Sequence, residues 1–233
     1  MLILGLNKTT LLDYPEHVAA TIFTGGCNFR CPFCHNKDLV FPQKTTTYSE
    51  NEILSFLKKR AGVLTGVCIT GGEPTLQKDL TDFLARIKDL GYLIKLDTNG
   101  YQPDILHNLL NQKLIDYCAM DIKNSLGKYA ITAGLSSCDL HRITESVSCL
   151  LSLTGSFPFE FRTTLVRELH DREDMLAISE WLKGAPAYYL QSYTDSKNVI
   201  TSGYHALSEQ SLSEYRDICL QNIPNTQLRG INL

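Results

Sequence analysis

The 233-residue chain contains no run of about 18 apolar residues, and this absence argues against a membrane-spanning helix. A basic surplus is also missing, because 22 lysines and arginines are outnumbered by 25 aspartates and glutamates and the net charge is -3. Proteins that bind nucleic acid usually carry excess positive charge, so the composition does not favour that class. The first residues lack a basic segment followed by a long apolar one, and we therefore expect no signal peptide and a cytoplasmic protein.

Linkers, internal repeats and low-complexity tracts are missing as well, so the sequence predicts a single domain over residues 1–233. Hydrophobic residues make up 43% of the chain and charged residues 20%. These are ordinary proportions for a globular protein of this length, which can bury a sizeable core without disulfide bonds.

Three of the eight cysteines lie within one short segment: Cys27, Cys31 and Cys34, with Phe33 before the last of them. A cubane iron–sulfur cluster has four irons, and each normally takes one thiolate. Three closely spaced thiolates leave one iron without a protein ligand, and an open coordination position is typical of a catalytic metal site. The spacing C-x3-C-x2-C therefore predicts a [4Fe-4S] cluster that binds a substrate or cofactor directly.

Other interpretations of the cysteines remain open. With His35, the three could form a Cys3His zinc site, although zinc ligands usually come as two separated pairs. A disulfide framework would need an oxidising compartment, which nothing in the sequence indicates. The five other cysteines form no second cluster, and we interpret them as core or surface residues: Cys68, Cys118, Cys138, Cys149 and Cys219.

Apolar runs and helical patterns alternate along the chain, which predicts an α/β fold of parallel strands joined by helices. The expected strands are 18–24, 67–70, 92–97, 117–122, 159–166 and 188–191. A capping box at Ser49, a proline at 103 and an aspartate at 171 mark the starts of three expected helices. A complete eight-unit barrel needs roughly 250 residues, so six units predict a partial (β/α)6 TIM-like barrel.

Polar side chains follow two of the expected strands at their C-terminal ends, where α/β barrels carry their chemistry. Asp97 ends the third strand, and Asp121 and Lys123 lie two residues apart at the end of the fourth. In the fifth strand, Arg162 shares a face with Glu160, and an inward-facing arginine is costly without an anion. Asp121 with Lys123, or Arg162 with Glu160, could equally form simple ion pairs.

Several motifs together resemble the radical SAM superfamily. The cysteine loop after an early strand and Gly71-Gly72-Glu73-Pro74 after a short apolar run are similar to its signatures. The segments 11–15 (Leu-Leu-Asp-Tyr-Pro), 34–36 (Cys-His-Asn) and 96–100 (Leu-Asp-Thr-Asn-Gly) resemble the glycyl-radical enzyme activating enzymes. Among these, the chain is most similar to activating proteins of anaerobic ribonucleoside-triphosphate reductase, with those of pyruvate formate-lyase as near relatives.

The resemblance implies a partial (β/α)6 barrel, a [4Fe-4S] cluster on the three cysteines and S-adenosylmethionine bound to the unique iron. It implies reductive cleavage of the sulfonium and abstraction of a glycine Cα hydrogen from a partner glycyl-radical enzyme. A flavodoxin or ferredoxin is the expected reductant, and neither nucleic acid nor a membrane is an expected partner.

The resemblance also implies roles for individual residues. Gly71 and Gly72 would let backbone approach the methionyl amino group, and Glu73 would orient that strand end. The methionyl carboxylate or the ribose would be bound by Lys123 and Arg162, and a monovalent cation would be held by Asp97, Thr98 and Asp121. The adenine would be held by Phe33, His35 and Asn36. Without the resemblance, 71–74 and 97–100 could be ordinary turns and Phe33 a core residue.

Two other functions remain possible from the sequence. One is a radical SAM enzyme acting on a small molecule, such as a protein similar to 7-carboxy-7-deazaguanine synthase. The other is a zinc-binding interaction module without catalysis, which an iron assay would separate at once. The segments 13–15 and 34–36 favour the activating enzymes over both.

Overall fold

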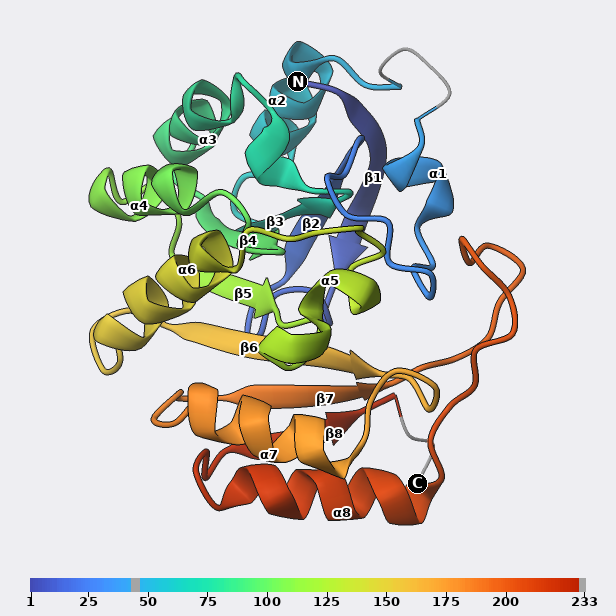
Figure 1. The fold of residues 1–233 in the computed structure, drawn as a ribbon. Helices are drawn as coiled ribbons and strands as arrows, with labels where there is room; N and C mark the ends of the chain where they lie inside the picture. Colours follow the sequence, from blue (N-terminus) through green and yellow to red (C-terminus); the bar gives the residue numbers. More distant parts are fainter. Residues whose placement is uncertain (43–46, 231–233) are drawn as a thin grey trace. The chain divides into compact units, whose positions relative to one another are not determined.

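A computed structural model of the chain describes residues 1–42 and 47–230. The chain divides into two compact units, Met1–Asn28 with Asp38–Ala119 and Phe29–Lys37 with Met120–Leu233, here called unit 1 and unit 2. The sheet follows the strand order β1-β2-β3-β4-β5-β6-β7-β8 (Figure 1). The expectation of a single domain over residues 1–233 stays a prediction.

Unit 1 contains four whole strands. β1 runs antiparallel to β2, and β2, β3 and β4 run parallel to one another. The bounds are β1 (Ile3–Thr10), β2 (Ala19–Thr24), β3 (Gly66–Gly71), β4 (Leu93–Thr98), α2 (Glu50–Lys59), η1 (Pro74–Leu76), α3 (Leu80–Asp89) and α4 (Pro103–Asn111). α1 (Lys37–Val40) and β5 (Tyr117–Asp121) each cross the division between the units.

Two helices of unit 1, α2 and α4, begin where the sequence predicts. Ser49 caps α2, and its side chain and that of Glu52 each accept a hydrogen bond from the other's backbone N–H, as a capping box requires. Pro103 is the first residue of α4. The buried residues of α3 are spaced as one helical stripe (Leu80, Phe83, Leu84 and Ile87), and burying each stabilises the fold by about 1.5–3 kcal/mol.

Unit 2 contains three further whole strands, and β6, β7 and β8 are parallel. Their bounds and those of the helices are η2 (Leu126–Lys128), α5 (Tyr129–Thr132), α6 (Leu140–Ser152), β6 (Phe159–Leu165), α7 (Arg172–Trp181), β7 (Tyr188–Ser192), α8 (Glu209–Leu220) and β8 (Thr226–Arg229). Asp171 caps α7, as predicted. α7 and α8 lie side by side, and α8 packs against β7 and β8 (Figure 1).

The predicted α/β fold is confirmed, because helices alternate with strands in a mostly parallel sheet. All six expected strands are present, and the structure adds β1 and β8 at the two ends of the strand order. The interiors of β2, β3 and β4 are buried almost without interruption, which is usual for parallel strands covered on both faces. None of the helices in the described residues is long and apolar enough to cross a membrane.

Candidate functional site

The cysteine loop begins directly after β2, and backbone hydrogen bonds hold its first two residues, Gly25 and Gly26. Gly25 donates its backbone N–H to Leu2 O at 3.0 Å, and Gly26 donates to Leu39 O at 2.7 Å. In unit 2, Cys34 N donates to Cys31 O at 3.0 Å, so these two cysteines lie at the ends of one tight turn. None of the eight cysteines is in a disulfide bond, and Cys31 is 6% exposed.

Two glycines let the end of β3 pack against the residues that precede Cys27. Gly71 has φ +127°, and a Cβ there would lie 2.3 Å from Thr24 O. A Cβ on Gly72 would lie 2.0 Å from Gly26 O. Hydrogen bonds from Gly72 N to Thr24 O (2.9 Å) and from Glu73 N to Gly26 O (2.8 Å) hold this contact. The backbone that comes close to Gly71 and Gly72 in the structure is that of Thr24 and Gly26, and an approach of the two glycines to a methionyl amino group stays a prediction.

Glu73 follows this turn and is 1% exposed. Its Oε1 accepts hydrogen bonds from Thr75 N (3.1 Å), Thr75 Oγ1 (2.6 Å) and Thr98 Oγ1 (2.7 Å), and its Oε2 accepts from Asn99 N at 2.7 Å. Burial raises the pKa of Glu73, and these hydrogen bonds oppose that shift. The carboxylate thus ties the end of β3 to the end of β4, and its role in orienting that strand end toward a cofactor stays a prediction.

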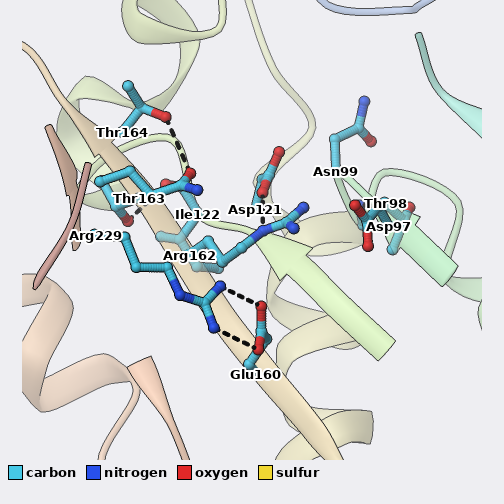
Figure 2. Close-up of polar contacts among 12 residues, drawn as sticks. Asp97, Thr98, Asn99, Asp121, Ile122, Glu160, Arg162, Thr163, Thr164 and Arg229 are labelled. Carbon is cyan, nitrogen blue, oxygen red and sulfur yellow. Dashed lines mark hydrogen bonds and ion pairs between the residues drawn. The ribbon is translucent and has the colours of Figure 1, made fainter. Parts of the chain in front are cut away.

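Asn99, the residue after β4, reaches the first cysteine. Its Nδ2 lies 3.9 Å from Cys27 Sγ and donates to Asn28 Oδ1 at 2.8 Å. Its Oδ1 accepts from Tyr101 N at 3.0 Å, which is the turn that Asn-Gly predicts. At the end of β4, Asp97 forms an ion pair with Lys95, which is 2% exposed. Figure 2 shows Asp97, Thr98 and Asn99 together at this strand end.

The structure brings three of the predicted site residues of unit 2 together as an ion triad: Asp121, Lys123 and Arg162. Arg162 Nε lies 2.9 Å from Asp121 Oδ1 (Figure 2), and Lys123 Nζ lies 3.0 Å from Asp121 Oδ2. Burial alone would raise the pKa of Asp121, but the two cations outweigh it and lower the pKa to about 2. Burial alone would lower the pKa of Lys123, but the negative charge of Asp121 outweighs burial and raises that pKa. The triad keeps one positive charge in excess.

The rest of the cysteine loop packs against the segment after β7. Thr201 N donates to Pro32 O at 2.9 Å, and the ring of His35 stacks on Tyr193 with 5.4 Å between centroids. His35 Nδ1 lies 3.1 Å from Ser196 Oγ. Phe33 is buried, whereas His35 and Asn36 are exposed. These positions are compatible with a nucleotide base at 33–36 and equally with Phe33 as a core residue.

An ion pair that the sequence did not predict crosses unit 2. Glu160 is fully buried and accepts from Arg229 Nη1 at 3.0 Å and from Nη2 at 3.4 Å (Figure 2). The Arg229 guanidinium lies 3.2 Å from the centroid of the Tyr189 ring. The sequence offered Glu160 as an alternative partner for Arg162. Its partner in the structure is Arg229, which lies 69 positions away on a strand too short to predict.

The residues of the cysteine loop fit an iron–sulfur cluster by their chemistry. None of the three cysteines is in a disulfide bond, and the buried Nδ2 of Asn28 has no hydrogen-bond partner in the described part of the chain, so it could donate to an anionic cluster. Within residues 1–42 and 47–230, no three His, Cys, Asp or Glu side chains are already grouped as ligands of a metal ion.

Comparison with known proteins identifies the family. Residues 21–125 match the radical SAM superfamily. A Methanocaldococcus jannaschii protein, provisionally named as a glycyl-radical enzyme activating enzyme, is 33% identical over 99% of this chain and 97% of its own length. A second protein of that organism with the same provisional name is 28% identical over 88% of this chain and 78% of its own.

More distant matches are shorter or confined to the fold. The 7-carboxy-7-deazaguanine synthase of Thermococcus kodakarensis is 26% identical over 44% of this chain and 48% of its own length. A radical SAM methyltransferase from Sphaerobacter thermophilus has the same fold, with a TM-score of 0.72 and 15% identity over 93% of this chain and 67% of its own. The chain belongs to the radical SAM superfamily and is similar to its glycyl-radical enzyme activating enzymes.

Proposed function

We propose that the chain is a radical SAM activase that abstracts a glycine Cα hydrogen from a partner glycyl-radical enzyme. The similarity that carries this proposal is the match to a glycyl-radical enzyme activating enzyme over almost the whole length of both chains. Anaerobic ribonucleoside-triphosphate reductase is the proposed partner, and a flavodoxin or ferredoxin the proposed reductant. Both are soluble proteins, so the proposal places the reaction in the cytoplasm.

The thiolates of Cys27, Cys31 and Cys34 would hold a [4Fe-4S] cluster, with S-adenosylmethionine on the iron that lacks a thiolate. When bound, the cluster supplies one electron for reductive cleavage of the sulfonium, the source of the species that takes the glycine hydrogen. The protein's task is to hold the groups in place and exclude water. The bonds that fix Gly25 and Gly26 support the proposal, because they hold the backbone just before Cys27.

The ion triad is the proposed site for the methionyl carboxylate or a ribose hydroxyl. Lys123 and Arg162 together carry two positive charges against one on Asp121, so the triad attracts an anion. Asp121 is ionised at neutral pH because its pKa is held near 2, so its carboxylate fixes the positions of both cations. A ligand carboxylate would therefore meet charges that are already paired and ordered.

Adenine recognition by Phe33, His35 and Asn36 is the proposed role of the loop's end, and the stacked ring of Tyr193 restrains His35 there.

A monovalent cation at Asp97, Thr98 and Asp121 is also proposed, and two of these side chains already have partners in the structure. Lys95 already supplies a positive charge to Asp97, and Thr98 donates its hydroxyl hydrogen to Glu73. A cation at Asp97 would therefore have to displace or share that carboxylate with Lys95.

A radical SAM enzyme acting on a small molecule is the second candidate. The match to 7-carboxy-7-deazaguanine synthase favours it, but that match covers less than half of either chain. The two candidates differ in where the radical ends: on a protein glycine in the first and on a small product in the second.

The test is to incubate the anaerobically reconstituted, reduced chain with S-adenosylmethionine and an anaerobic ribonucleotide reductase. The activase proposal predicts deoxyadenosine and a glycyl doublet in the electron spin resonance spectrum of the reductase. A variant with Cys138 and Cys149 changed to alanine is the matched control and should retain both signals, because these cysteines lie outside the loop. Deoxyadenosine without a doublet on any glycyl-radical enzyme would favour the small-molecule candidate.

A further inference from the structure

The carboxamide of Asn99 has a fixed orientation. Its Oδ1 accepts the backbone N–H of Tyr101 at 3.0 Å, so its Nδ2 must face the opposite way. That nitrogen has two hydrogens and two acceptors: Asn28 Oδ1 at 2.8 Å and Cys27 Sγ at 3.9 Å. Turning the amide over would place Oδ1 against Cys27 Sγ and would bring Nδ2 against another donor, Tyr101 N. The hydrogen bond that forms the turn therefore also determines that the sulfur meets an N–H group.

The backbone that carries Asn99 is equally constrained. Asn99 N donates to Glu73 Oε2 at 2.7 Å, Thr98 Oγ1 donates to Glu73 Oε1 at 2.7 Å, and residue Asn99 is 5% exposed. Leaving a buried hydrogen-bonding group without its partner is destabilising. Asn99 therefore cannot move away from Cys27 without breaking bonds to a buried carboxylate.

We propose that Asn99 is a positioning residue whose Nδ2–H hydrogen-bonds the Cys27 sulfur and raises the reduction potential of a cluster bound there. The inference rests on the cluster of the proposed function. Hydrogen bonds to the sulfurs are among the factors that set the potential of an iron–sulfur cluster. Reduction adds one electron from the external reductant and breaks no bond, so the reduced cluster carries one more negative charge. An N–H donor stabilises that state over the oxidised one.

The test is a reductive titration with dithionite and redox mediators, with electron spin resonance of the reconstituted chain as the readout. Asn99→Ser retains a hydroxyl that can accept from Tyr101 N, and Asn99→Asp retains Oδ1, but both remove the donor to Cys27. We expect the ratio of reduced to oxidised cluster at a fixed potential to fall about tenfold, which is about 59 mV for a one-electron couple. Asn111→Ser, at an exposed position ending α4, is the matched control and should leave the ratio unchanged.

Equal potentials in the wild type and both Asn99 variants would overturn the role of Asn99 while leaving the cluster in place. If neither variant holds iron, Thr98→Val gives the second measurement, because it removes the hydrogen bonds of Thr98 Oγ1 to Glu73 and to Gly100 N and leaves the Asn99 carboxamide intact. It should lower the ratio by less than the Asn99 variants would, and an unchanged ratio would again overturn the role. A wild-type chain that binds no iron would overturn the proposed function itself.

Discussion

Adding one methyl group at Gly72 should disrupt the approach to the first cysteine. Its Cβ would lie 2.0 Å from Gly26 O, and real Cβ contacts essentially never fall below 3.0 Å, so the backbone must move by about 1 Å. That movement breaks or lengthens the bonds from Gly72 N to Thr24 O and from Glu73 N to Gly26 O. Losing two buried backbone hydrogen bonds with added strain should lower the free energy of unfolding by about 2–4 kcal/mol in Gly72→Ala.

Gly127→Ala is the matched control, because a Cβ at Gly127 would meet nothing within 4 Å. The assay is urea unfolding of both apoprotein variants and the wild type, followed by far-UV circular dichroism, with iron content measured after reconstitution. We expect a lower midpoint and less iron for Gly72→Ala only. If Gly72→Ala unfolds at the wild-type midpoint, the close packing of Gly72 against Gly26 is refuted.

Two further predictions concern the ion pairs of unit 2. The pKa of Asp121 is about 2 in the folded chain, below its ordinary value of 3.8, so its contribution to stability is complete above about pH 4 and is lost as the pH falls towards 2. Asp121→Asn should remove this dependence of the free energy of unfolding on pH. An unchanged dependence between those pH values would show that Asp121 is not the group that causes it. Arg229→Ala leaves the buried Glu160 carboxylate without that partner and should destabilise the chain by about 2–4 kcal/mol in urea unfolding. Glu160→Gln in the same chain should restore part of this loss, and strictly additive effects would show that the two side chains do not interact.

Local signals explain why much of the fold could be predicted. The capping box at Ser49 and the proline at 103 act within one helical turn, so the sequence alone locates the starts of α2 and α4. β1 was missed because its burial does not alternate: three consecutive residues in its second half, Asn7, Lys8 and Thr9, are exposed. β8 has four residues and a single apolar one, Leu228, which is too short a pattern to distinguish from a loop.

The candidate site shows the same division between local and distant information. The cysteine trio and Gly71-Gly72-Glu73 are contiguous motifs, so spacing and residue type identify them. Which groups meet depends on strand register and on long separations, as in Glu160 with Arg229 and Arg162 with Asp121. Asn99 lay within a predicted motif, but its contact with Cys27 comes from the packing of β4 and could not be read from the sequence.

Iron content after anaerobic reconstitution shows whether Cys27, Cys31 and Cys34 hold a [4Fe-4S] cluster. We expect about four irons per chain in the wild type, a characteristic electron spin resonance signal on reduction, and a change in that signal on addition of S-adenosylmethionine. Replacing Cys27, Cys31 and Cys34 together by serine should abolish all three results and leave the circular dichroism of the apoprotein unchanged. Full iron in that variant, or a wild-type signal indifferent to S-adenosylmethionine, would contradict the account.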